Sequence, residues 1–311
     1  SYASIYGNKI DIRFYYLPQS EKKISALFSE IPAMLDFFER TIGPYPFASE
    51  KAGFVETPHL GMEHQTVNAY GNKFLKDEFG FDRLMQHELS HEWFGNQVTA
   101  SDWDHMWLHE GFGAYMQPLY ARYLHGNMAY LAYLYKQRQG IANRYPLVFG
   151  KSRTGWEAFD STKNSGGDIY VKGSLVLHSL RELIGDQAFY AATRELVYGN
   201  IDPKPGNFEP RFASTADFIK LINRHSGQKL NWFFNVYVKQ AALPELIIDR
   251  KPDFIRLAWQ VPNDLPFPMP LEVSVNGKLQ VLDLASPKQI PAKSEDIVIV
   301  DPNSKVLRAD A

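Results

Sequence analysis

The chain has 311 residues, a length that favours two domains over one small core. A hydrophobic fraction of 45% and an aromatic fraction of 14% are typical of a folded globular protein, and a net charge of −2 gives no general attraction to nucleic acid or anionic membranes. No stretch reaches the roughly 18 apolar residues that span a bilayer, and without cysteine any metal must be bound by His, Asp or Glu.

The N-terminal part of the chain reads as short strands around one helix. Residues 9–17 alternate between apolar and polar side chains and predict a strand. A helix is expected over residues 21–43, in which Pro32 favours a kink. Residues 45–58 and 61–71 read as further strands. Because the chain starts directly in strand-like alternation, without a signal-peptide pattern, we expect a fragment or a processed form.

Helical periodicity dominates the middle of the chain. A first helix is expected over residues 81–98, and a second is expected to start at Asp102 or Asp104 and to stop at Gly126, with Pro118 inside it. After a loop-rich stretch, further helices are predicted over residues 169–184, 186–198, 215–226 and 231–240.

The pattern changes to short strands separated by turns after Pro244. The sequence therefore predicts an α+β protein with two domains. Residues 1–240 form a mainly helical domain with a small mixed sheet, and residues 241–311 form a small β-sandwich.

The sequence HELSH has the spacing of a metal site on a helix. Four residues advance a helix by about 400°, so His87 and His91 lie on one face and can bind one ion. Glu88 points about 100° away from His87, where it can accept a proton from a metal-bound water. Taken alone, the HExxH pattern also occurs by chance, and both histidines could then be ordinary core or surface residues.

A catalytic zinc ion needs a third protein ligand and one open position. Glu110 follows His91 after 18 intervening residues, so that one turn and a second antiparallel helix would bring it back to the first. Glu110 thus completes a His, His, Glu set, while His109 would point away from it by about 100°. Other histidines remain alternative ligands: His59, His64, His105 and His109.

The segment HELSHEWFGNQVT, with WLHEGFGAY shortly after it, resembles the zinc signature of the gluzincin aminopeptidases, the family of aminopeptidase N and leukotriene hydrolase. The resemblance implies a thermolysin-like catalytic domain with one zinc ion per chain. By this resemblance the zinc ligands are His87, His91 and Glu110, and Glu88 is the general base.

The sequence GMEH is similar to the family's Gly-x-Met-Glu-Asn exopeptidase motif. The resemblance implies that Glu63 binds the free α-amine of the substrate, with Gly61 and Met62 beside it. A carboxylate near the metal anchors an ammonium and fixes cleavage after the first residue. His64 stands where the family has Asn, and Glu63 taken alone reads as an exposed strand residue.

The sequence DIYVKGSLVLHSLR is similar to the family's Tyr-x-Lys-Gly segment, which implies that Tyr170 donates its hydroxyl to the oxyanion of the tetrahedral intermediate. The resemblance extends continuously over residues 10–248. Family members also carry an N-terminal β domain, which supplies a further residue to the amine site, and many carry a C-terminal helical domain. We expect this chain to lack both.

The resemblance predicts a zinc-dependent aminopeptidase that acts on peptides with a free N-terminus. We expect no nucleic-acid partner and no transmembrane segment, and neither the preferred N-terminal residue nor the oligomeric state follows from the sequence. Two alternatives stay open. One is an endopeptidase or epoxide hydrolase, and the other is a zinc-bearing peptide-binding protein without turnover.

Overall fold

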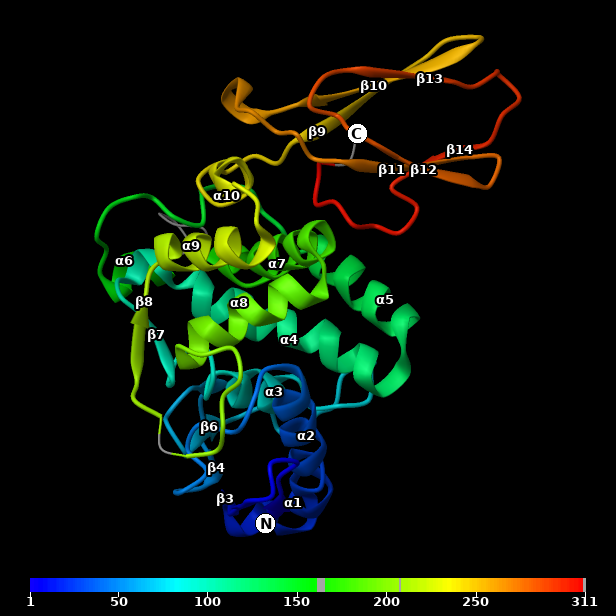
Figure 1. Cartoon of the computed structure of the whole chain (residues 1–311). Helices are drawn as coiled ribbons and strands as arrows, with labels where there is room; N and C mark the ends of the chain where they lie inside the picture. Colours follow the sequence, from blue (N-terminus) through cyan, green and yellow to red (C-terminus); the bar gives the residue numbers. More distant parts are fainter. Residues whose placement is uncertain (161–165, 207, 310–311) are drawn as a thin grey trace.

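The computed structural model describes residues 1–160, 166–206 and 208–309. A small sheet with the first helices lies at one end of the molecule, a helical body forms the middle, and two small sheets lie at the other end (Figure 1). This arrangement confirms the predicted α+β class. Among the helices of the described ranges, none combines the length and the hydropathy that a membrane span requires.

The helical body agrees with the sequence prediction where the helix ends have local signals. The helices predicted over residues 186–198 and 215–226 are confirmed as α8 and α9. Gly199 ends α8 in the left-handed conformation, and a Ser214–Asp217 capping box begins α9. The helices are α1 (Glu21–Phe28), α2 (Ile31–Thr41), α3 (Arg83–Ser90), α4 (Trp107–His125), α5 (Asn127–Arg138), α6 (Gly155–Phe159), α7 (Val171–Ile184), α8 (Asp186–Tyr198), α9 (Thr215–Ser226) and α10 (Asn231–Tyr237).

The single kinked helix predicted over residues 21–43 is wrong. The chain forms α1 and α2 instead, separated by a short turn, and Pro32 lies in the first turn of α2. Proline is tolerated there because the first N–H groups of a helix have no intrahelical partner. The predicted loop-rich stretch holds the short helix α6, and residues 161–165 of that stretch lie outside the described part.

The N-terminal sheet has the strand order β3-β4-β6-β5, with β5 antiparallel to β6 and the other pairs parallel. The single strand predicted over residues 61–71 is therefore wrong, because the chain turns back and pairs Gly61 with Tyr70. Both strands of this hairpin pack against α3. The strands before the C-terminal sheets are β1 (Tyr2–Ala3), β2 (Lys9–Ile10), β3 (Ile12–Tyr15), β4 (Ala52–Glu56), β5 (Gly61–Met62), β6 (Asn68–Tyr70), β7 (Val98–Ala100) and β8 (Arg211–Ala213).

The helix predicted over residues 81–98 is also too long. It ends at Ser90, and residues 98–100 form β7, which pairs in parallel with β8 from much later in the chain. The physical reason is the non-local strand pairing, which outweighs the local helical periodicity.

Helix α4 passes through Pro118 without a break. Proline cannot donate to the carbonyl of Ala114, four residues earlier. The side chain of Gln137 on α5 donates to that carbonyl instead, at 2.8 Å. A side chain from the neighbouring helix thus replaces the missing backbone bond and keeps α4 continuous.

The C-terminal strands form two antiparallel three-stranded sheets, ordered β13-β10-β9 and β12-β11-β14. Hydrogen bonds tie this part to the helical body: His178 Nε2 donates to Ser304 O and the backbone N–H of Leu307 donates to Ser179 Oγ, each at 2.8 Å. The division into domains near residue 241 stays a prediction. The strands are β9 (Glu245–Arg250), β10 (Phe254–Gln260), β11 (Leu271–Val275), β12 (Lys278–Leu282), β13 (Lys288–Pro291) and β14 (Val298–Val300).

Candidate active site

A buried cap fixes the start of α3. Asp82 accepts hydrogen bonds from the backbone N–H groups of Leu84 and Met85, both at 3.0 Å. Its other carboxylate oxygen accepts a 2.5 Å hydrogen bond from the hydroxyl of Tyr70 on β6. The cap therefore attaches α3 to the sheet, and it sets where the histidines one and two turns further on are placed.

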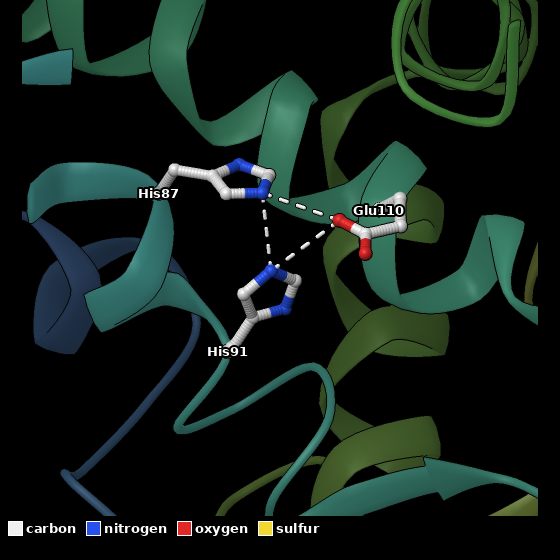
Figure 2. A group of neighbouring side chains, drawn as sticks. All are labelled: His87, His91 and Glu110. Atoms are coloured by element: carbon white, nitrogen blue, oxygen red, sulfur yellow. Dashed lines mark hydrogen bonds and ion pairs between the residues drawn. The ribbon is translucent and has the colours of Figure 1, made fainter. Parts of the chain in front are cut away.

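Three side chains from α3 and α4 converge on one point (Figure 2). Oε2 of Glu110 lies 3.2 Å from His87 Nε2 and 3.4 Å from His91 Nε2, and the two nitrogens are 3.1 Å apart. Burial disfavours the ionised form of Glu110, but the hydrogen bonds and charges of the two histidines outweigh it and hold its pKa well below its usual range. Two imidazoles and an ionised carboxylate form a ligand set that suits zinc.

The surroundings of the two histidines fit a metal. Nδ1 of His91 donates to the carbonyl of Phe94 at 2.9 Å, which leaves the lone pair of Nε2 free for an ion. His87 reaches the same point only because α4 carries a glycine opposite it. A Cβ on Gly113 would lie 2.9 Å from His87 Cε1.

Glu88 lies beside the three converging side chains. It is buried, and its Oε2 has no hydrogen-bond partner among the described side chains and backbone. Burial raises the pKa of Glu88 to about 7, against the opposing effect of His87 and His91. A carboxylate in such surroundings is suited to accept and release a proton near neutral pH.

Glu63 directly follows β5 and lines the same cavity. Its carboxylate, that of Glu88 and Nε2 or Nδ1 of His91 lie within 4.8 Å of one another. They form a second possible metal group in the described ranges, but it has one imidazole and two carboxylates and shares His91 with the first. The set with Glu110 is the better match to the nitrogen-rich ligands that zinc prefers.

The other residues of the GMEH segment differ in their relation to the site. Gly61 lies so close to the site that a Cβ there would come within 2.4 Å of Glu88 Oε1. Met62 is 45% exposed and borders the cavity described below. His64 is exposed, and its backbone N–H donates to Asn68 Oδ1 at 3.1 Å.

Tyr170 is the N-cap residue of α7, and its ring centroid lies 5.9 Å from that of His87. Burial, then the charge of Glu110, raises the pKa of Tyr170 above its ordinary value, which keeps the hydroxyl protonated and able to donate. The glycine pair Gly111 and Gly173 brings α4 and α7 together, since a Cβ on Gly173 would lie 2.9 Å from Gly111 Cα. This close packing positions Tyr170 near Glu110.

The residues to which the sequence analysis gave a role all line one cavity of about 1110 Å³: Gly61, Met62, Glu63, His87, Glu88, His91, Glu110 and Tyr170. The sequence interpretation missed Arg83, Trp103, Phe159 and a role for His109, which also line it. Of the four alternative histidine ligands, none belongs to a cluster of metal-ligating side chains in the ranges that the structure describes. For example, Nδ1 of His105 forms a hydrogen bond with Oγ1 of Thr215 at 3.1 Å.

Comparison with known proteins places this site in a family. Residues 33–237, well over half of the chain, match the model of the peptidase family M1 domain. Aminopeptidase 2, mitochondrial, from Saccharomyces cerevisiae is 25% identical over 266 residues, which are 77% of this chain and 26% of that protein. The chain thus spans about a quarter of the length of this curated relative.

Two solved structures are similar in fold. Aminopeptidase A of Legionella pneumophila matches with a TM-score of 0.74 at 19% identity, over 96% of this chain and 36% of that one. A mutant M1 zinc metallopeptidase from Deinococcus radiodurans, bound to a Tyr-Ser-Ala substrate, matches with a TM-score of 0.55 at 27% identity, over 69% of this chain and 44% of that one. The family match and the shared fold agree with the resemblance in the zinc signature, and the chain belongs to peptidase family M1.

Proposed function

We propose that this chain carries the catalytic centre of a zinc-dependent aminopeptidase, with one zinc ion bound by His87, His91 and Glu110. The main support is the convergence of their three donor atoms within 3.4 Å, from α3 with its C-cap residue His91 and from α4, which packs against α3. A bound zinc ion lowers the pKa of its water to about 7 and polarises the carbonyl of the scissile bond.

The residues of the chain divide the remaining chemistry among them. Glu88 accepts the proton of the attacking water and passes it to the leaving amine, and its buried position beside the ligands suits both transfers. The Tyr170 hydroxyl donates a hydrogen bond to the developing oxyanion. Glu63 binds the α-ammonium of the substrate by a charge-assisted hydrogen bond, which places the first peptide bond over the metal site.

The experiment that tests this proposal is the substitution Glu88→Gln. The amide has nearly the same shape but cannot accept the proton, so hydrolysis of an aminoacyl 4-nitroanilide should fall by at least roughly a hundredfold. Zinc content per chain, measured by elemental analysis, should stay at the wild-type value. Glu195→Gln is the matched control, because Glu195 pairs with Arg224 and does not line the cavity. Full turnover by Glu88→Gln would refute the assignment.

A panel of blocked peptides separates exopeptidase from endopeptidase activity. If Glu63 binds the amine, acetylation of the N-terminus should abolish cleavage, because it removes the positive charge. Cleavage of free and acetylated peptides at equal rates would instead favour an endopeptidase. Zinc at one ion per chain without turnover of any peptide would favour a binding protein.

We also propose that residues 1–240 and 241–311 form separate domains. The change from helices to two small antiparallel sheets after Pro244 supports this division. Limited proteolysis that cuts between α10 and β9 and leaves two stable products would test it.

A further inference from the structure

His109 lines the cavity but takes no part in the chemistry proposed above. It lies on α4 directly before Glu110, and its side chain is 7% exposed. Its ring centroid is 6.4 Å from that of His91. A buried imidazole this close to a metal site, but outside the ligand set, needs another explanation.

One nitrogen of His109 has a fixed role. The backbone N–H of Ala100, on β7, donates to Nε2 at 2.8 Å. A backbone N–H is a donor only, so Nε2 must be the acceptor. In a neutral imidazole the proton then lies on Nδ1, which makes Nδ1 the donor of this ring.

The donor nitrogen faces Glu63. Nδ1 is buried and has no hydrogen-bond partner among the residues that the structure describes, and Oε1 of Glu63 lies 3.9 Å from it. This separation exceeds the length of a hydrogen bond by about 1 Å, and a movement of the Glu63 side chain by that distance toward the ring would form the bond. Gly95 borders this side of the ring: a Cβ there would be in ordinary van der Waals contact with Nδ1, at 3.5 Å, and its φ of +153° disfavours any side chain.

Glu63 also needs a partner that holds it. Its carboxylate lies within 4.8 Å of that of Glu88, so it must be oriented against a like charge to meet an ammonium. A donor that binds one carboxylate oxygen of Glu63 would leave the other oxygen for the substrate.

We propose that His109 is a positioning residue for the amine anchor: its Nδ1–H donates to the Glu63 carboxylate when the substrate ammonium binds. This inference rests on the proposed aminopeptidase function. It assigns to His109 a part in selecting free N-termini, without contact with the metal or the reacting bond.

Two conservative substitutions separate this role from packing. In His109→Gln the amide oxygen can take the place of Nε2 and accept from Ala100, but nothing replaces the Nδ1 donor. In His109→Asn the shorter amide can replace the Nδ1 donor toward Glu63, while Ala100 loses its acceptor. If His109 only supports β7, His109→Asn should be the more damaging change. If His109 positions Glu63, His109→Gln should weaken the preference for an amine more.

The measurement is the preference for an amine, taken as a ratio of two dissociation constants by calorimetry. L-leucine hydroxamate and 4-methylpentanehydroxamic acid carry the same metal-binding group and differ only in the α-amino group. In the wild-type zinc enzyme, the charge-assisted hydrogen bond between Glu63 and the α-ammonium should make L-leucine hydroxamate bind roughly tenfold or more tightly than the compound without the amine. His109→Gln should lower the ratio by about three- to tenfold, and His109→Asn should keep it within about twofold of wild type. In a Glu63→Gln background, His109→Gln should change the ratio no further.

Each other outcome overturns a defined part of the reasoning. An unchanged ratio in His109→Gln, or an equal loss in both variants, overturns the role of His109 alone. A wild-type ratio near one overturns the amine site, and with it the proposed aminopeptidase function. Zinc content and circular dichroism check that each variant folds.

A measurement on the unchanged sequence covers variants that fail to fold. In protein with ¹⁵N-labelled histidine, the His109 ring should be protonated at Nδ1, and this proton should shift downfield with L-leucine hydroxamate but not with the compound that lacks the amine. A proton on Nε2 instead would refute the inference.

Discussion

Substitution of Gln137 by leucine should destabilise α4, the helix that carries the proposed metal ligand Glu110. Gln137 is buried on α5, where its amide donates to Ala114 O at 2.8 Å and its Oε1 accepts from Ser174 Oγ at 2.7 Å. The first bond is the important one, because Pro118 has no N–H to give to the Ala114 carbonyl. Leucine fills a similar volume but leaves that buried carbonyl without a partner.

The expected cost follows from the groups left unpaired. A buried acceptor without a partner costs about 1–3 kcal/mol. The Ser174 hydroxyl can turn to the carbonyl of Tyr170 in its own helix, so it adds little. We therefore expect the free energy of unfolding to fall by about 2 kcal/mol, which lowers the Tm of a unit of about 200 residues by roughly 4–8 °C.

A double-mutant cycle with Pro118→Ala tests the reason for the loss. Alanine at position 118 restores a backbone donor for the Ala114 carbonyl, so Gln137→Leu should cost at least about 1 kcal/mol less in that background. Thermal and urea unfolding followed by circular dichroism measure all four proteins. Gln139→Leu, an exposed position at the end of the same helix, is the control and should change stability by less than about 0.5 kcal/mol. An equal cost of Gln137→Leu with and without Pro118 would refute the reasoning.

Other predictions concern the metal site. Gly113→Ala places a Cβ 2.9 Å from His87 Cε1, so the affinity for zinc should fall about 10- to 100-fold. Competition with a chelator measures this affinity, and an unchanged value would contradict the geometry. Gly61→Ala places a Cβ 2.4 Å from Glu88 Oε1, so kcat should fall by about a hundredfold at an unchanged zinc content, whereas loss of zinc would show a different cause. Removal of divalent ions with 1,10-phenanthroline should abolish hydrolysis and lower Tm, and zinc should restore both; activity that persists without metal would exclude a zinc mechanism.

The parts of the fold that follow from the sequence are those with local causes. Helices α8 and α9 end at glycines, and a capping box begins α9, so the pattern of a few neighbouring residues determines their bounds. The HExxH spacing is equally local, because the pitch of one helix places His87 and His91 on one face. These features do not depend on the rest of the chain.

The parts that the sequence did not show depend on contacts between distant segments. The hairpin of β5 and β6 looks like one strand in the sequence, and its reversal brings Glu63 to the cavity. The approach of Glu63 to His109 joins residues 46 positions apart, and no periodicity predicts it. Likewise, the support of Ala114 by Gln137 requires the packing of α4 against α5.

The early end of α3, where the sequence prediction was wrong, has a direct bearing on the metal site. The carbonyls of the three residues after Ser90 accept from N–H groups five positions later: His91 O from Asn96, Glu92 O from Gln97 and Trp93 O from Val98, at 2.8–3.2 Å. In a continued α-helix the Phe94 carbonyl would accept from the N–H of Val98. In the wider turn the Phe94 carbonyl instead accepts a hydrogen bond from His91 Nδ1, at 2.9 Å.

That contact determines which nitrogen of His91 is available to a metal. With its proton on Nδ1 and bound to Phe94, the ring presents the lone pair of Nε2 to His87 and Glu110. A regular helix through residue 98 would keep both histidines on one face but would remove this acceptor. The pairing of β7 with β8 holds Val98 in a strand, so the long-range contact that ends the helix also orients the ring of His91, the proposed ligand at its end.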